Sequence, residues 1–220
     1  SEKIPFTRIY DEGIVSNRHA ITVPDGRNLW HFANVYFEPR NPMLYRVVHE
    51  KTEDNIAVIA LRPEILGRHD IYITTGNAAH SLSGILYPTD AKKQLAEIVK
   101  NSVGVEWWNS EDGSKRKIMA ECLIPNFIEP DMIQTIYVAK HKTQKLVEKL
   151  VRREDIPVIA QPDMFFLPIR KIQLTPKLVL AQGDLFFSRM QTLSVSVNTV
   201  GVMGKGLASR AKYQFPGVYV

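Results

Sequence analysis

The sequence predicts an α+β fold, and three observations support this class. Segments with strand character outnumber the amphipathic helices, of which two are clear. The strands and helices follow one another in mixed order, without the regular alternation that builds a parallel α/β sheet. The composition, with 45% hydrophobic and 23% charged residues and no repeat or low-complexity tract, is that of a globular protein.

The first 28 residues are expected to be irregular, because Pro24 and the Asp25-Gly26 pair are typical of turns. Further along, apolar residues recur at helical spacing in two segments, and Asp90 is expected to cap the first of these helices. The expected elements are, in order, strands at 31–39, 55–66 (ending as a helix) and 70–79, a helix at 90–101, strands at 116–125 and 132–139, a helix at 142–154, and a strand at 156–166.

We place a domain boundary near residue 175, because Pro168 and Pro176 interrupt the pattern there. The predicted domains are 1–175 and 176–220. Only about 45 residues follow the boundary, fewer than a domain usually needs to bury a sufficient core. The second domain is therefore expected to be C-terminally incomplete, and the missing initiator methionine suggests a trimmed or partial sequence.

The second domain is expected to begin as an α/β unit. A strand from Leu178 leads into a Gly183-Asp184 turn, and a second strand at 194–197 runs into Asn198. A glycine-rich loop and a basic helix at Leu207 to Phe215 follow. A loop of this kind is typical of a phosphate-binding site at the N-terminus of a helix.

The charge balance is basic, with 28 Lys and Arg against 23 Asp and Glu and a net charge of +5. A polyanionic partner such as a nucleic acid is consistent with this excess. A basic globular enzyme without such a partner explains the composition equally well.

The single cysteine, Cys122, excludes a disulfide framework and a cysteine-rich zinc site. No metal is expected, and a reducing compartment fits this cysteine content. The sequence contains no apolar run of about 18 residues and no signal-peptide pattern. We therefore expect a cytoplasmic protein that does not bind a membrane.

Glu121 lies in a segment, 118–124, whose other residues are apolar. Strands alternate their faces, so Glu121 shares one with Met119 and Leu123, where a carboxylate needs a partner. In one interpretation Glu121 points outward from a half-exposed strand. In the other it is held beside a reacting sugar, where it accepts a hydrogen bond from a ribose hydroxyl and stabilises an oxocarbenium-like centre.

Two tracts resemble the DarT family, the toxin halves of DarT–DarG toxin–antitoxin systems. The tract NVYFEPRNPMLY at 34–45 is its most specific part, and RKIMAECL at 116–123 contains an Ala-Glu pair like that of the family. The turn ITTGNAA at 73–79 is similar to a Thr-Asp-Gly-Asn-Ala-Ala turn, with Thr75 where Asp is common. The resemblance covers about residues 8–175.

The resemblance implies an ADP-ribosyltransferase fold and a reaction that moves ADP-ribose from NAD onto a base of single-stranded DNA, most often thymine, with release of nicotinamide. Glu121 then matches the catalytic glutamate. Arg18 matches an arginine that helps to activate the target base, since an always-charged guanidinium can stabilise an anionic base nitrogen. A surface arginine is the alternative for Arg18.

The resemblance also implies positions for the two substrates. The NAD pocket is expected to be lined by Tyr36, Phe37, Met43 and Tyr45, whose aromatic faces and thioether suit stacking. Single-stranded DNA is expected to meet Lys115, Arg116 and Lys117 through its phosphates and Trp107 and Trp108 through an unpaired base. Core packing and a solvated charge run are the alternatives for these two sets.

One departure from the family concerns its first strand, which carries a His and a Thr that bind the ribose and pyrophosphate of NAD. No such strand precedes Ser1. Either the N-terminal part lies outside this sequence or part of the cofactor site is lacking, and the fragment alone is then expected to be inactive.

The closing stretch resembles the start of a DarG-like macrodomain, the antitoxin partner that binds and removes ADP-ribose. The resemblance implies that Asp184 accepts a hydrogen bond from the adenine amino group and that Asn198 contacts the distal ribose. Backbone amides of the loop through Gly201, Gly204 and Gly206 are implied to surround the phosphates.

The leading hypothesis is therefore a DNA ADP-ribosyltransferase toxin domain joined to the start of its macrodomain antitoxin. A non-catalytic protein that binds ADP-ribose or nucleic acid is a second hypothesis. A transferase that modifies RNA or protein is a third, because the glutamate chemistry is shared and target choice lies in loops.

Overall fold

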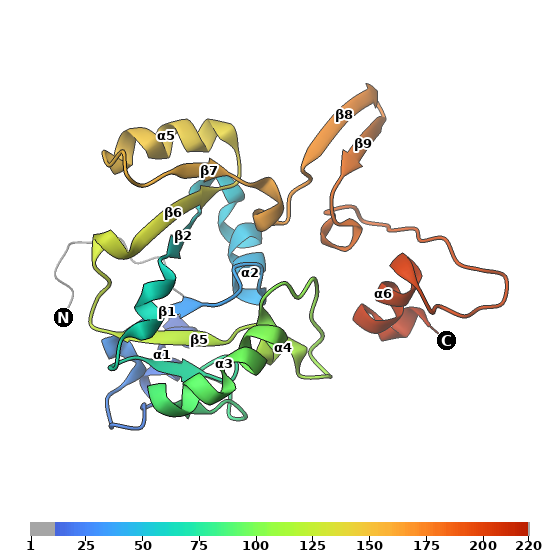
Figure 1. Cartoon of the computed structure of the whole chain (residues 1–220). Helices are drawn as coiled ribbons and strands as arrows, with labels where there is room; N and C mark the ends of the chain where they lie inside the picture. The colour runs from blue at the N-terminus through green and yellow to red at the C-terminus, as the bar shows by residue number, and fades with distance from the viewer. Residues whose placement is uncertain (1–11, 220) are drawn as a thin grey trace.

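The computed structural model describes residues 12–219, whose strands form three sheets (Figure 1). The helices are α1 (Glu12–His19), α2 (Pro42–Lys51), α3 (Pro88–Ser102), α4 (Ser114–Lys117), α5 (His141–Val151) and α6 (Gly206–Gln214). The strands are β1 (Phe32–Tyr36), β2 (Ala57–Leu61), β3 (Tyr72–Thr74), β4 (Ile85–Leu86), β5 (Glu121–Pro125), β6 (Ile133–Val138), β7 (Val158–Ala160), β8 (Arg170–Thr175) and β9 (Leu178–Gln182).

The largest sheet has the order β1-β5-β3-β4 and is antiparallel throughout. All five residues of β5 are buried, because the strand lies between β1 and β3 and both of its faces are covered. Cys122 and Ile124 pack with Ile98 of α3 on one face, and Leu123 packs with Phe32 on the other. Glu121 is thus the first residue of a strand that is buried along its whole length.

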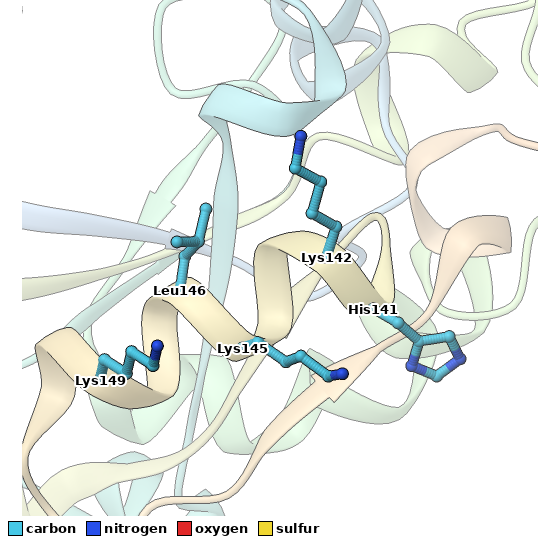
Figure 2. A pocket seen from close by; sticks show the side chains of 5 residues that line it. All are labelled: His141, Lys142, Lys145, Leu146 and Lys149. Atoms are coloured by element: carbon cyan, nitrogen blue, oxygen red, sulfur yellow. The ribbon is translucent and has the colours of Figure 1, made fainter.

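The second sheet, β2-β6-β7, pairs β2 with β6 antiparallel and β6 with β7 parallel. Val147 and Val151 of α5 pack against this sheet. The outer face of α5 is basic, and a shallow hollow on it is lined by the aliphatic stems of its lysines (Figure 2). The side chains around this hollow are His141, Lys142, Lys145, Leu146 and Lys149.

The α+β class predicted from the sequence is confirmed, and most of the predicted elements are present. Segment 55–66 does begin as a strand and end helical, with β2 followed by a 3-10 helix at Pro63–Gly67. Segment 156–166 is shorter than expected, since β7 gives way to a 3-10 helix at Pro162–Phe165.

Several boundaries predicted from the sequence are wrong. Residues 12–19 form α1 rather than irregular chain, while residues 1–11 lie outside the described residues. The helix expected from Asp90 begins at Pro88, which supplies its first turn. Residues 114–117 form the short helix α4, so the strand expected from 116 starts only at Glu121.

Further elements were missed, among them α2, β4 and β8, and one predicted strand is absent. Helix α2 begins at Pro42 because Asn41 caps it, its side chain accepting from the amides of Met43 and Leu44. Strand β8 pairs with β9 as an exposed hairpin, and residue 175 lies at its turn. Within the described chain, residues 194–197 pair with no strand, since no neighbouring strand is at hand to complete a ladder.

No helix among the described residues is long and apolar enough to cross a membrane. In the same range, no group of three or more His, Cys, Asp or Glu side chains is placed to hold a metal ion.

Candidate active site

The carboxylate of Glu121 is fully buried, with a side-chain exposure of 0%. The interpretation in which it points to solvent is therefore wrong. Its Oε1 accepts a hydrogen bond from the backbone N–H of Ala78 at 2.9 Å. Its Oε2 accepts one from Nη2 of Arg18 at 2.7 Å. Both oxygens are thus held by donors, as a buried anion requires.

Arg18 reaches Glu121 from the last turn of α1, 103 residues earlier in the chain. Its Nη1 makes a longer contact of 3.4 Å to Oε1 of Glu121, so the guanidinium faces both oxygens. The burial of Arg18 by itself lowers its pKa, but the hydrogen bond and charge of Glu121 outweigh this, and the net pKa is raised. Arg18 is therefore not the surface arginine of the alternative interpretation.

Tyr36 lies directly opposite Glu121 in the β1–β5 register. Paired residues of neighbouring strands place their side chains on the same face of the sheet. Burial first, and then the negative charge of Glu121, raise the pKa of Tyr36 well above its usual range. Its hydroxyl stays protonated near neutral pH and remains a donor beside the carboxylate.

The turn at 74–79 fixes the position of Glu121. Thr74 Oγ1 accepts from the backbone N–H of Glu121 at 2.8 Å and donates to the carbonyl of Gly76 at 2.6 Å. The next residues bring the Ala78 amide onto the carboxylate. These roles of Thr74 and Ala78 were missed in the sequence, where only the resemblance of the turn to the family pointed to them.

The predicted basic set of α4 divides into two kinds of side chain. Lys115 and Lys117 are exposed and free to meet a polyanion. Arg116 instead donates from Nη1 to the carbonyl of Thr75 at 3.1 Å and to the Ser83 hydroxyl at 3.3 Å. Its backbone carbonyl accepts from the Asn77 amide. Arg116 therefore links α4 to the turn at 74–79.

The residues expected to line the NAD pocket do not all lie beside Glu121. Tyr36 does, whereas Phe37 packs against the core that contains Cys122. Met43 is in the first turn of α2. Tyr45, two residues further, has the rings of His49, Trp108, Phe166 and Phe187 around it.

Trp107 and Trp108 lie in the loop 103–113 between α3 and α4, which we call the Trp loop. Both are half-buried. Trp107 stacks against Tyr213 of α6, with ring centroids 6.5 Å apart. Trp108 packs against Tyr45, Phe166 and Phe187. Their stacking on an unpaired base remains a prediction.

In the closing stretch, the two polar side chains expected to bind ADP-ribose already have hydrogen-bond or ion-pair partners. Asp184 accepts from the Phe186 amide and pairs with Arg210 at 2.8 Å, so its carboxylate is already engaged. The Asn198 side chain bonds both backbone groups of Val202 and closes the glycine loop on itself. Of the three glycines of this loop, Gly201 and Gly206 have a positive φ, whereas Gly204 does not.

This arrangement can do two things chemically. A buried carboxylate with its charge offset by one arginine and one amide can stabilise a cationic sugar without reorganising. A guanidinium that is hydrogen-bonded to that carboxylate can also stabilise a negative charge that develops close by. Both features are typical of enzymes that transfer a glycosyl group.

Comparison with solved structures defines the fold class. The chain is similar to Thermus sp. 2.9 DarT in complex with ADP-ribosylated ssDNA, with a TM-score of 0.63 and 18% identity over 72% of this chain and 80% of that chain. A structure of the same protein in complex with NAD+ gives a TM-score of 0.56 and 18% identity over 66% and 77% of the two chains. The fold is thus that of a DarT-type ADP-ribosyltransferase.

A family model described as ssDNA thymidine ADP-ribosyltransferase, DarT, matches residues 1–166, and the chain belongs to this family. A DNA ADP-ribosyl transferase–DNA ADP-ribosyl glycohydrolase fusion protein of Thermosipho africanus is 51% identical over all of this chain. The chain spans 56% of the length of that relative. The solved Thermosipho africanus DarTG in complex with ADP-ribose has a TM-score of 0.93 over 97% of this chain and 56% of that chain.

Proposed function

We propose that the protein transfers ADP-ribose from NAD to a thymine of single-stranded DNA, as the toxin half of a toxin–antitoxin pair. The observation that carries the proposal is the buried carboxylate of Glu121 between Arg18 and the Ala78 amide, in a chain of the DarT family. Thermus DarT has been solved with NAD+ and with ADP-ribosylated ssDNA, which supports both substrates for this chain.

NAD supplies the ribosyl carbon whose bond to nicotinamide breaks, the nicotinamide leaving with the bonding electron pair. Glu121 then lies where its negative charge stabilises the cationic sugar and its oxygen accepts from a ribose hydroxyl. Tyr36, beside it on the same sheet face, closes that side of the site. The rigid hold on Glu121 means that little reorganisation accompanies the charge change.

Arg18 has a second task in this proposal. The guanidinium remains protonated, so it acts on the target base by stabilising the anion left when a ring nitrogen gives its proton to water. The base nitrogen then forms the new bond to the ribosyl carbon. In the structure Arg18 pairs with Glu121, so one cation serves the carboxylate before the reaction and the base during it.

The test is made in the full-length protein and replaces Glu121 by glutamine, which keeps the shape but removes the charge. We expect the mass of the ADP-ribose adduct on a thymine-containing single-stranded oligonucleotide to appear at a rate reduced by about 10²- to 10³-fold. Glu129→Gln, an exposed residue beyond the end of β5, is the matched control and should retain the wild-type rate. Undiminished adduct formation by Glu121→Gln, or adducts on RNA or protein in preference to DNA, would overturn the assignment.

We also infer that residues 176–220 are the beginning of a macrodomain. The fusion protein of Thermosipho africanus, whose name includes a glycohydrolase, aligns with the whole of this chain and supports this inference. Asp184, Asn198 and the glycines at 201, 204 and 206 would then contact ADP-ribose once the remaining macrodomain is present. In a protein that carries both halves, Gly204→Glu should abolish ADP-ribose binding by calorimetry while the transferase rate stays unchanged.

A further inference from the structure

The Trp loop meets the last part of the chain at a cluster of four aromatic rings. Tyr45, Trp108, Phe166 and Phe187 come from α2, the Trp loop, the end of the 3-10 helix at Pro162–Phe165 and the 3-10 helix at Leu185–Phe187. All six pairs of these rings are in contact, with centroids between 4.6 Å (Phe166–Phe187) and 6.2 Å (Trp108–Phe166) apart. One ring of the four, that of Phe187, lies beyond the transferase family match.

Two arginines hold Phe187 in this cluster. The guanidinium carbons of Arg40 and Arg210 lie 5.5 and 5.7 Å from its ring centroid. Asp184 pairs with Arg210 at 2.8 Å and lies 3.9 Å from Arg40. Arg210 and Asp184 are only 14% and 15% exposed, and Arg210 Nη2 makes no hydrogen bond of good geometry among the described residues. The Asp184 carboxylate therefore offsets the charge of Arg210, and this pair ties α6 to the cluster of four rings.

A second contact joins α6 to the Trp loop directly. Nδ2 of Asn109 donates to the backbone carbonyl of Tyr213 at 2.8 Å. The ring of Tyr213 stacks on Trp107 with an interplanar angle of 14°. Figure 1 shows the loop between α3 and α4 facing α6, although about 100 residues separate them in the chain.

The inner side of the Trp loop is anchored on the transferase body. Oε2 of the buried Glu38 accepts from the Gly104 amide at 2.8 Å. Near its other end, the backbone N–H of Asn109 donates to Ser114 Oγ at 2.7 Å. The loop then continues through α4, with its exposed Lys115 and Lys117, to Glu121. Trp108 also packs on Tyr45 and Phe166 of the body. The C-terminal segment, residues 184–214, adds the contacts of Phe187 with Trp108 and of Tyr213 with Trp107 and Asn109.

We propose that the C-terminal segment is a positioning element for the Trp loop, and that the protein needs it to bind single-stranded DNA well but not to bind NAD. The DNA part of this inference rests on the proposed function. The solved Thermosipho africanus relative aligns over 97% of the chain with a TM-score of 0.93, a coverage too high to omit the segment, which supports the same placement. Phe187, Tyr213 and Arg210 are its positioning residues.

The physical reason is conformational. Without the C-terminal segment, Trp107 has no ring partner among the described residues and Trp108 keeps only Tyr45 and Phe166. A loop held by fewer contacts samples more arrangements, and ordering it on binding weakens the affinity for its ligand. Contacts from Phe187 and Tyr213 restrict Trp107 and Trp108 before DNA arrives. Glu121 and Tyr36 are held by the sheet and by the turn at 74–79, so the site for the sugar does not need these contacts.

The test uses Phe187→Ala and Tyr213→Ala, each of which removes a ring that touches the Trp loop. Phe215→Ala is the matched control, because its ring contacts Phe186 of the same segment and no residue of the loop among the described ring contacts. Tyr213 is exposed, so its truncation keeps the test valid should Phe187→Ala fail to fold. Phe187→Leu should restore part of the DNA affinity that Phe187→Ala loses, because the leucine side chain refills part of the space in the cluster of four rings.

Two readouts are measured. The first is the ¹⁹F spectrum of protein labelled with 5-fluorotryptophan, with the resonances assigned by Trp→Phe substitution. The second is the pair of dissociation constants for a thymine-containing oligonucleotide and for NAD. In both variants we expect the Trp107 and Trp108 resonances to shift or broaden, the DNA constant to rise at least fivefold and the NAD constant to stay within twofold.

Unchanged fluorine spectra, or equal losses of DNA and NAD binding, would overturn the proposal. Absence of DNA binding by the wild-type protein would sink the proposed function and the DNA part of this inference. The fluorine spectra would still decide whether the segment orders the loop, so the two failures are distinguishable.

Discussion

Glu121 owes its position to residues far from it in the sequence. Thr74, 47 residues away, accepts from its amide, Ala78 donates to its side chain, and Arg18 pairs with it across 103 residues. The strand pattern marked Glu121 as a lone carboxylate in an apolar segment but left open whether it points outward, and only the family resemblance assigned Glu121 and Arg18 to a site. Thr74 was not identified, since a threonine in a strand is ordinary and only the folded turn shows its two hydrogen bonds.

Thr74→Val tests this support with little change of shape. The substitution leaves the buried Glu121 amide without its acceptor and the Gly76 carbonyl without its donor. We expect the free energy of unfolding, measured by chemical denaturation, to fall by about 1–3 kcal/mol, with a loss of transferase rate. The same substitution at Thr135, buried in β6 of the other sheet, is the control, and it should leave the rate unchanged. An unaffected rate in Thr74→Val would show that Glu121 does not depend on this contact.

At the scale of elements, the sequence predicted the strands and helices whose apolar residues alternate or recur at regular spacing. It missed α2, since no element was expected at 42–51, whereas Asn41 caps a helix there and Pro42 occupies its first position. It also began the strand predicted at 116–125 too early, since residues 114–117 form the helical turn α4 and the strand starts at Glu121. Short elements of this kind are decided by tertiary contacts, here those of Arg116 with the turn at 74–79.

Gly76→Ala tests the contact between that turn and α4. An added Cβ would lie 2.6 Å from Nη1 of Arg116 and 2.8 Å from its backbone oxygen, so the turn and α4 must move apart. We expect a loss of about 1–3 kcal/mol in the free energy of unfolding. The Ala78 amide would shift with the turn, so the transferase rate should fall by tenfold or more, toward the roughly 10²-fold that a misplacement of about 1 Å can cost.

Gly84→Ala is the matched control for this prediction. Gly84 follows the same turn, but an added Cβ there would meet neighbours only at 3.8 and 3.9 Å, which is ordinary van der Waals contact. Its rate and stability should stay close to those of the wild type. Equal effects at both glycines would mean that general loss of helix or strand geometry, rather than the contact with Arg116, is responsible.

At the scale of the whole molecule, the sheet β1-β5-β3-β4 holds acidic side chains that keep their protons at a pH where the unfolded chain would lose them. Burial raises the pKa of the Cys122 thiol in β5 to about 12, and burial is also the main cause of the raised pKa values of Tyr36 in β1 and Tyr72 in β3. An acid whose folded pKa exceeds its unfolded pKa binds more protons in the folded state, so stability falls as the pH rises. For Cys122 the stabilisation is complete below about pH 9 and is lost between about pH 9 and 12.

This window predicts how stability responds to alkali and how much of the response belongs to one residue. Each pH unit above about 9 removes about 1.4 kcal/mol for one such group, so Cys122 accounts for a loss of about 2 kcal/mol at about pH 10.5. Cys122→Ala has a fixed cost from its lost packing, but the fall in its free energy of unfolding from about pH 7 to about pH 10.5 should be smaller by that amount. The measurement is urea denaturation of both proteins at the two pH values, with the tyrosines present in each. Equal falls would show that the thiol ionises within the folded protein, and hence that β5 is open to solvent at the very residue that follows Glu121.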